Sequence, residues 1–352
     1  MPTVTLADLG GWPAVLGPLT SGQDLTSTQA AAAMAEVLDG AATPSQIAGF
    51  IVALRMKGET VAELTGLLSA MLDAAERVPV PPGAVPVDTC GTGGDRSHTI
   101  NVSTIAALFV AGAGATVCKH GNRAASSACG SADLLEALGV VIDLGPQEVG
   151  RCLREAGMGF CFAPRFHASM RHAAPTRREL GVPTVFNFLG PMANPARVRR
   201  QVLGVSEASM AERMVRVLEA GGTERALVVY GHDGLDELTT TTTSTVLELR
   251  DGTVRTYVVD PVELEMTPAA GRDLLGGDAA TNAGLTRRVL DGESGPHRDV
   301  VVLNAAAGIV AAGLADTLLD GLDLARASVD DGRAAAALDR LVAVSQAAAI
   351  AP

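Results

Sequence analysis

A proline-rich segment, 78-VPVPPGAVPV-87, divides the chain into two stretches with different hydrophobic periodicity. Before it, apolar residues recur at helical spacing; beyond it, short strand-like runs alternate with helix-like runs. Proline restricts the backbone and cannot continue a helix, so this segment predicts a stiff hinge. A chain of 352 residues is long enough to form two domains, one on each side of that hinge.

The first 80 residues are predicted to form helices. Three helix starts have a capping-box pattern, in which a threonine precedes Gln or Glu by three positions: Thr26-x-x-Gln29, Thr43-x-x-Gln46 and Thr60-x-x-Glu63. The apolar residues that follow the last two starts fall on single helix faces: Ile47, Phe50, Ile51 and Leu54, then Leu64, Leu67, Leu68, Met71 and Leu72. We therefore expect a small helical bundle, which also offers a surface for dimer formation.

Beyond the hinge, seven short apolar runs are predicted strands: 85–89, 115–119, 140–144, 159–163, 202–205, 226–230 and 300–303. Because helix-like stretches separate them, the pattern indicates an α/β domain with a largely parallel central sheet. The β-prone run 239–249 leads to a turn signal at 251-DG-252, which predicts a hairpin. Ligands of such folds bind beyond the carboxyl ends of the strands.

Composition excludes several classes of partner. The formal net charge of −12 argues against general binding of nucleic acid or of an anionic membrane surface, and ten aromatic residues are too few for base-stacking platforms. The chain has no uninterrupted apolar span of about 18 residues, and its N-terminus lacks the pattern of a signal peptide. The five cysteines include no CxxC pair, which favours reduced, buried thiols in a cytoplasmic protein.

The glycine-rich stretch 91-GTGGD-95 follows the first predicted strand. It is no dinucleotide fingerprint, because the third glycine of GxGxxG would fall at Arg96, and no GKS or GKT follows as in a P-loop. A helix is expected to begin near Asn101 or Ser103, and a glycine turn before a helix N-terminus offers backbone amides to an anion. The alternative is an ordinary tight turn.

A second polar cluster, 119-KHGNRAASSACGSAD-133, directly follows the second predicted strand. Its cations, hydroxyl groups and small residues suit the oxygens of a phosphate or pyrophosphate. A solvated polar loop is the alternative, which such a density of donors in an acidic protein disfavours.

A third cluster, 231-GHDGLDEL-238, follows the strand at 226–230 and contains the adjacent carboxylates of Asp236 and Glu237. Paired carboxylates without soft ligands suit Mg²⁺ that bridges substrate phosphates. A divalent cation would also neutralise phosphate charge inside an acidic protein. The alternative is a surface acidic turn.

The segment 163-APRFHASMRHAAPTRREL-180 contains two histidines, His167 and His172, whose spacing of five does not fit a zinc site on one helix face. Its arginines at positions 171, 177 and 178 offer guanidinium groups for a carboxylate. Periodicity does not decide which arginine faces inward. No GxSxG nucleophile motif is present, and no covalent mechanism is indicated.

Together, these segments resemble the anthranilate phosphoribosyltransferase family. The resemblance extends over nearly the whole chain through GTGGD, NVST, KHGNRAASS, FAPxxH, RREL, FNFLGPMANP and GxDGLDE, in that order. It implies a small helical domain hinged to a large α/β domain, related in fold to class II nucleoside phosphorylases. The helical domain would comprise residues 1–80 and about 175–200, and would carry dimerisation and part of the anthranilate site. Residues 83–174 and 201–352 would form the domain that binds phosphoribosyl pyrophosphate.

Carried over position by position, the resemblance implies three sets of site residues. The phosphoribosyl pyrophosphate site would contain Gly91, Gly94, Asp95, Thr99, Asn101, Ser103, Thr104, Lys119, Gly121, Asn122, Arg123, Ala124, Ala125, Ser126, Ser127 and Ser131. Anthranilate would meet Gly91, Asn122, Arg177, His120, Pro164 and His167. Two Mg²⁺ ions per subunit would be held by Ser103, Asp236 and Glu237, and Lys119, Arg177 and Glu237 would carry catalysis.

The implied reaction joins the anthranilate amine to C1 of the ribose and expels pyrophosphate, a step of tryptophan biosynthesis in a cytoplasmic homodimer. The chain departs from the family at 167-HASM-170, where His-Pro-Ala-Met is frequent, and at Met192, where leucine is common. Both changes are mild and concern the shape of the anthranilate channel. A pyrimidine nucleoside phosphorylase-like enzyme and a catalytically silent nucleic-acid-binding relative are the alternatives. The DGLDE element argues against the first, and the acidic composition argues against the second.

Overall fold

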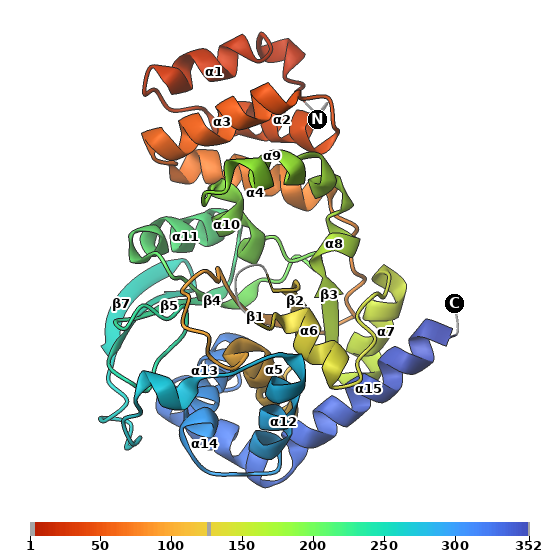
Figure 1. Cartoon of the computed structure of the whole chain (residues 1–352), viewed down its shortest axis with the longest axis vertical. Coiled ribbons are helices and arrows are strands. Elements are labelled where there is room, and N and C mark those ends of the chain that lie inside the picture. Colours follow the sequence, from red (N-terminus) through yellow and green to blue (C-terminus); the bar gives the residue numbers. More distant parts are fainter. Residues whose placement is uncertain (1–3, 125–127, 351–352) are drawn as a thin grey trace.

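The computed structural model describes residues 4–124 and 128–350, and a helical bundle forms one end of the molecule (Figure 1). A short 3-10 helix, η1 (Ala7–Leu9), precedes α1 (Pro13–Thr20), α2 (Ser27–Leu38), α3 (Pro44–Lys57) and α4 (Val61–Ala74). All three predicted capping boxes are formed, at the starts of α2, α3 and α4. The apolar faces predicted for α3 and α4 are buried, except that Leu72 is only partly covered.

The large domain contains a seven-stranded sheet in the order β3-β2-β1-β4-β5-β6-β7. The first five strands in this order pair in parallel, and β6 and β7 continue the sheet as an antiparallel hairpin. The strands are β1 (Val87–Gly91), β2 (Val117–Gly121), β3 (Met158–Phe162), β4 (Arg200–Gly204), β5 (Arg225–Gly231), β6 (Ser244–Arg250) and β7 (Thr253–Val259). The mostly parallel α/β architecture and the hairpin are therefore confirmed.

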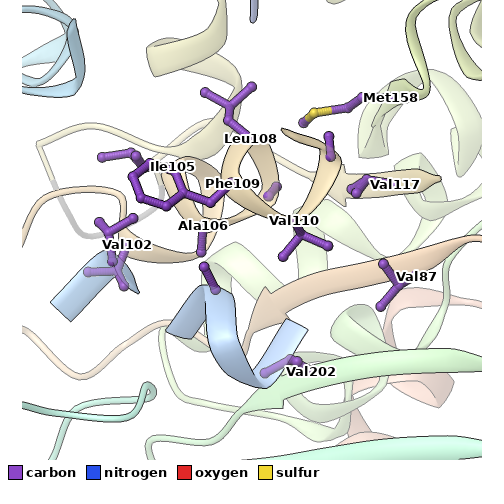
Figure 2. Close-up of a cluster of buried hydrophobic side chains, with 14 of the residues drawn as sticks. Val87, Val102, Ile105, Ala106, Leu108, Phe109, Val110, Val117, Met158 and Val202 are labelled. Atoms are coloured by element: carbon purple, nitrogen blue, oxygen red, sulfur yellow. The ribbon is translucent and has the colours of Figure 1, made fainter. Parts of the chain in front are cut away.

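Helices cover both faces of the sheet (Figure 1). On one face, α5 (Val102–Gly112) packs over the central strands, and Figure 2 shows its apolar side chains above residues of β1, β2, β3 and β4. The same core includes α6 (Ser131–Ala137), α7 (Pro146–Ala156), α12 (Ala279–Leu290), α13 (Pro296–Ala312), α14 (Leu318–Asp330) and α15 (Arg333–Ile350). Among residues 4–124 and 128–350, no helix is long and apolar enough to cross a bilayer.

The opposite face of the sheet is covered by α11 (Ala208–Ala220), which in turn packs against α4 of the helical bundle, and the same core includes the segment that follows β3. That segment contains α8 (Ala163–Phe166), η2 (Ala168–His172), α9 (Ala174–Leu180), α10 (Val185–Leu189) and η3 (Gly190–Met192). Helix α9 contacts α3, and α10 contacts both α3 and α4. These contacts support the prediction that residues near 175–200 join the helical domain, although the domain boundaries stay a prediction.

Two predicted strands are wrong. Residues 140–144 form an irregular connection between α6 and α7, where Val140, Ile142 and Leu144 are buried against helices rather than paired in the sheet. Residues 300–303 lie inside α13, whose side chains are buried on every side from Val300 to Ala312. A helix with no exposed face has no amphipathic period, so its short β-branched run resembles a buried strand.

A charged cluster links the helical bundle to the large domain. Arg55 of α3 places its Nη2 atom 2.9 Å from Glu207, the residue that precedes α11, and its guanidinium lies 5.3 Å from the ring centroid of Phe188 in α10. Glu59 is fully buried beside Arg55, with 3.8 Å between Nη1 and one carboxylate oxygen. Within the described ranges, neither oxygen of Glu59 has a hydrogen-bond partner in another residue. Burial raises the pKa of this carboxyl above its usual value, despite the nearby arginines.

Because the carboxyl of Glu59 is buried, we expect the stability of the folded protein to decrease as the pH rises. A folded-state pKa above the unfolded value means that the folded protein binds the proton more tightly, so stability decreases as pH rises above about 4.5. Glu59→Gln cannot ionise, so its melting temperature should exceed that of the wild type by a margin that grows as the pH rises above about 4.5 and becomes constant above the folded-state pKa of Glu59. The exposed substitution Glu263→Gln is the control. A margin independent of pH would contradict this origin.

Candidate active site

The carboxyl ends of five parallel strands meet at one edge of the sheet, and the polar clusters follow these ends. After β1 the chain makes an open loop before α5, whose N-cap is Asn101 as expected. Gly93 and Gly94 have φ values of 65° and 81°, and Arg96 and His98 also have positive φ. Side chains other than glycine adopt this conformation at a cost, so the loop carries backbone strain between the strand and the helix.

Three carboxylates gather above this loop. Asp95, Asp236 and Glu237 place ligand oxygens within 4.8 Å of one another. The backbone N–H of Gly93 donates a 2.7 Å hydrogen bond to Asp236 Oδ2, which joins the glycine loop to the DGLDE loop. A Cβ atom at Gly91 would lie 2.2 Å from the same oxygen, and one at Gly204 would lie 1.6 Å from the carbonyl oxygen of Asp236. Both strand-end glycines are therefore required for the close approach of Asp236.

Burial and the neighbouring negative charges make ionisation of Asp236 and Glu237 less favourable. Burial, followed by the negative charge of Asp95, raises the pKa of Asp236 to about 6. Burial and the charges of Asp236 and Asp95 raise the pKa of Glu237 well above its usual value, although Lys119 and the backbone of Ser103 oppose that shift. Burial is the first cause of both raised pKa values, and the mutual repulsion of the three carboxylates adds to it.

The donors of this cluster fit Mg²⁺. All of them are hard oxygens, the ligand type that Mg²⁺ prefers, and their uncompensated charge is what a divalent cation relieves. The hydroxyl of Ser103, at the start of α5, lies 3.4 Å from the ammonium of Lys119 and so faces the same region. Asp95 was predicted for the substrate site and not for the metal, but the structure places its carboxylate within this group.

Lys119 is buried beneath the glycine loop, with only 1% of its surface exposed. Its ammonium donates to the carbonyl oxygen of Thr89 in β1 and to Ser103 Oγ. Burial lowers the pKa of Lys119, whereas the charges of Asp88, Glu237 and Asp236 act in the opposite direction. The ammonium therefore contributes positive charge from below the carboxylate cluster.

The loop after β2 is built around Asp133 at the start of α6. Its Oδ2 atom accepts hydrogen bonds from the backbone N–H groups of Ala124 and Gly130, both at 2.9 Å. Arg123 donates to Asp133 and to Glu136, each at 2.8 Å, so its charge is already paired. The predicted residues Ala125, Ser126 and Ser127 lie outside the described residues.

Hydrogen bonds tie this second loop to the N-terminus of α5. Asn101 donates from Nδ2 to the carbonyl oxygen of Cys129 at 2.9 Å, and Thr104 donates to Ser131 Oγ at 3.0 Å. Thr99 forms an isolated antiparallel bridge with Leu275. Gly121 packs against Ser131, where a Cβ atom would come within 3.0 Å of that side chain. Asn122 is exposed at the same edge of the sheet. The two donor-rich loops are therefore adjacent.

A fully buried carboxylate, Asp88 of β1, organises the other side of this edge. Its Oδ2 atom lies 2.5 Å from His120 Nδ1 and accepts from Asn194 Nδ2 at 2.8 Å. His120 Nε2 lies 2.9 Å from the carbonyl oxygen of Gly190, so both ring nitrogens of His120 have hydrogen-bond partners. Gln201 of β4 donates to the carbonyl oxygen of Pro191 at 2.7 Å. Burial disfavours the charge of Asp88, but His120, Lys119 and Asn194 hold its pKa below the usual value.

His167 lies close to this network as a neutral histidine. Its Nε2 atom is 2.8 Å from the carbonyl oxygen of Ala193. Burial, together with the charge of His120, lowers the pKa of His167 to about 4. Pro164 lies one turn before it, exposed in α8. His120 and His167 are therefore held against the segment 190–194, which returns from α10 to the sheet.

Arg177 is the arginine that faces inward. Its guanidinium lies 4.8 Å from the ring centroid of Phe186, and burial lowers its pKa. Arg171 and Arg178 are exposed. In the part of the chain that the structure describes, Arg177 makes no ion pair with a carboxylate. Its forked donors are available for one from outside.

Several residues at this edge were not predicted from the sequence. Asp88, Asn194 and Gln201 form the buried network described above, and Gly204 makes room for Asp236. Asp233 accepts a 2.7 Å hydrogen bond from Thr239 Oγ1 and so braces the DGLDE loop. In the sequence, such residues could be recognised as polar residues inside apolar runs, because a buried polar side chain without a hydrogen-bond partner destabilises the fold. That signal identifies a buried polar group but not its partner.

Comparison with known proteins places this geometry in a class. Residues 83–335 match the family described as "Glycosyl transferase family, a/b domain", and residues 13–75 match its helical bundle domain. The fold and the site therefore define a two-domain glycosyl transferase, with the small helical and large α/β parts that the sequence predicted.

Individual relatives give a narrower family. The anthranilate phosphoribosyltransferase of Symbiobacterium thermophilum is 51% identical over 328 residues, which are 93% of this chain and 96% of that protein. The crystal structure of the anthranilate phosphoribosyltransferase from Thermus thermophilus matches with a TM-score of 0.89 at 43% identity, and covers 94% of this chain and 99% of that one. The chain belongs to the anthranilate phosphoribosyltransferase family, so the resemblance drawn from its motifs is confirmed.

A further match concerns ligands. The anthranilate phosphoribosyltransferase from Saccharomyces cerevisiae, in a structure described as a complex with phosphoribosyl pyrophosphate and Mg, matches with a TM-score of 0.87 at 26% identity. That match covers 96% of this chain and 98% of that one. Neither the phosphorylase-like alternative nor the nucleic-acid-binding one is favoured by these relatives.

The contact between Gly91 and Asp236 predicts a selective loss of metal binding. In Gly91→Ala the new methyl group has to displace the Asp236 carboxylate, which is the mobile end of a side chain, so the fold should persist. We expect the Mg²⁺ concentration for half-maximal activity to rise at least about tenfold, as when metal ligands lose their orientation. Gly284→Ala, on an exposed face of α12 with open space around it, is the matched control. An unchanged Mg²⁺ requirement in Gly91→Ala would contradict the metal assignment.

Proposed function

We propose that this chain transfers the phosphoribosyl group of 5-phosphoribosyl 1-pyrophosphate to the amine of anthranilate, the reaction of its family. The observation that carries the proposal is the cluster of Asp95, Asp236 and Glu237 closed onto the GTGGD loop at the carboxyl edge of the sheet. A pyrophosphate needs both a cation site and backbone amides, and this edge offers the two together.

In the proposed reaction, the amine nitrogen of anthranilate forms a bond to C1 of the ribose while the bond from C1 to the pyrophosphate oxygen breaks. Pyrophosphate departs with the bonding electrons, and the proton that the amine loses passes to the departing pyrophosphate. An aromatic amine is already a neutral nucleophile, so positioning and stabilisation of the leaving group supply most of the catalysis. Inversion at C1 is expected.

The residues divide this work. The loop amides and Lys119 would stabilise charge on the leaving pyrophosphate, and Asp236, Glu237 and Ser103 would hold Mg²⁺. When bound, Mg²⁺ supplies positive charge to the phosphate oxygens. We propose two ions per subunit, as the family resemblance implies, one held by Ser103 and Glu237 and the other by Asp236 and Glu237, two carboxylates that lie close together. His120 takes no proton in this scheme, since both of its ring nitrogens are engaged.

Arg177 would bind the carboxylate of anthranilate. Its guanidinium is held against Phe186, is half-buried and has no carboxylate partner in the described ranges. Asn122, Pro164 and His167 would line the approach to it. Closure of the helical domain towards the sheet would bring Arg177 to the amine acceptor site and exclude water, which otherwise hydrolyses the donor.

The wider biology stays a prediction. We propose that the enzyme acts in tryptophan biosynthesis in the cytoplasm and forms a homodimer through the helical domain. The five buried cysteines are compatible with the cytoplasm, and Met56, which is exposed at the end of α3, is compatible with a dimer contact on the helical domain.

The direct test follows anthranilate fluorescence. Purified protein with phosphoribosyl pyrophosphate and Mg²⁺ should consume anthranilate, and chelation of the metal should stop the reaction. Glu237→Gln should lower turnover at least about 100-fold at saturating Mg²⁺ because it removes a proposed ligand. The exposed change Glu263→Gln should have no effect. Fluorescence that does not fall in the wild-type reaction would refute the proposed function.

A second test separates the two substrates. Arg177→Lys keeps a positive charge but loses the planar fork and its stacking on Phe186, so the KM for anthranilate should rise about tenfold or more. The KM for phosphoribosyl pyrophosphate should change little. Arg178→Lys, at the neighbouring exposed position, is the matched control. If both KM values rise together, Arg177 acts on the fold or on closure rather than on the anthranilate carboxylate.

A further inference from the structure

A buried asparagine of α13 holds the backbone of the DGLDE loop. Asn304 Oδ1 accepts a 3.0 Å hydrogen bond from the N–H of Leu238, and Asn304 Nδ2 donates to the carbonyl oxygen of Leu238 at 2.7 Å. The same amide nitrogen donates to the carbonyl oxygen of Val300 at 2.9 Å, one turn earlier in the helix. The side chain is 4% exposed. Both of its polar atoms are therefore used, and two of its three bonds clamp one residue of the loop.

The clamped residue directly follows the proposed metal ligands Asp236 and Glu237. The N–H of Leu238 belongs to the peptide group that begins at the carbonyl carbon of Glu237, so holding it restrains the backbone from which the Glu237 side chain projects. The carbonyl of Leu238 belongs to the next peptide group. A bidentate bond to both groups stops the loop from rotating at this point. The side chain of Leu238 is itself fully buried.

A buried asparagine in this apolar helix destabilises the fold unless its side chain forms hydrogen bonds. Within the run from Val300 to Ala312 every side chain is buried, and asparagine is the polar member of that run. A buried amide without partners destabilises a protein, and asparagine is a weaker helix former than leucine or alanine. An apolar residue would fill the same space in the helix without that cost, but it would leave the N–H and carbonyl of Leu238 without partners.

We propose that Asn304 is a positioning residue for the metal site: it orients the backbone after Glu237 so that the carboxylates of Asp236 and Glu237 face one another. The inference rests on the proposed function, because it assigns those carboxylates to Mg²⁺. Asn304 touches neither substrate nor metal and acts only through the loop. The site is thereby attached to α13, which packs beneath β1, β4 and β5.

Two variants test the clamp. Asn304→Asp keeps the acceptor for the N–H of Leu238 and can donate to the carbonyl oxygen of Leu238 only when its carboxyl is protonated, whereas Asn304→Leu removes both bonds. We expect the Mg²⁺ concentration for half-maximal activity to rise at least about tenfold in Asn304→Leu and less in Asn304→Asp, as for other residues that orient metal ligands. The dissociation constant of Mn²⁺, measured by the loss of its free electron paramagnetic resonance signal, should rise in the same order without any turnover.

Ser345→Ala is the matched control, because Ser345 is a fully buried hydrogen-bonding residue of α15 that bonds Val141 and lies outside the site. It should lower the melting temperature and leave the Mg²⁺ and Mn²⁺ responses unchanged. A general loss of stability would affect all three variants alike. Equal metal responses in Ser345→Ala and Asn304→Leu would overturn the proposal.

A measurement on the wild type keeps the proposal testable if the Asn304 variants fail to fold. Hydrogen exchange of the Leu238 amide should be slow without metal, since its proton is donated to a buried side chain. Exchange at the rate of an open loop would overturn the clamp. If the wild type is active but its variants keep normal metal responses, the clamp alone fails. If the wild type is inactive with Mg²⁺ and both substrates, the proposed function fails and the clamp's role fails with it.

Discussion

The buried carboxylate of Asp88 is the interaction on which the arrangement of the two parts depends. It lies on β1, pairs with His120 of β2 and accepts from Asn194, a residue of the chain returning from the helical side. A buried charge is tolerated only where donors surround it, so removing any one partner leaves a group that water cannot reach. The sheet, the 190–194 segment and the histidines are thus held in one geometry.

A second constraint is the close approach of three carboxylates at the carboxyl ends of the strands. Asp95, Asp236 and Glu237 come together because glycines end β1 and β4, and a side chain at either position would exclude Asp236. Folding therefore brings together groups that repel one another, and the raised pKa values of Asp236 and Glu237 record that cost. A bound cation would relieve the repulsion between these carboxylates. The cation could then attract a polyanion, although the chain as a whole is acidic.

The helical bundle shares its apolar core with one face of the sheet, through α4 and α11. Closure of the two parts would then require packed surfaces to slide, with the ion pair of Arg55 and Glu207 and the prolines before β1 at its margin. Arg177 lies on α9, on the helical side of this junction, against Phe186.

The sequence by itself determined the helical bundle, the parallel sheet and the loops that follow its strands, because capping boxes, periodicity and glycine turns are local properties. It also identified the family, through motifs whose order is specific, and proposed the residues of the site. Only the tertiary structure decided that Arg177 rather than Arg178 is covered, that 300–303 belongs to a helix, and that Asn304 reaches Leu238. These facts depend on contacts between residues far apart in the chain, and no local pattern encodes the partner of a buried polar group.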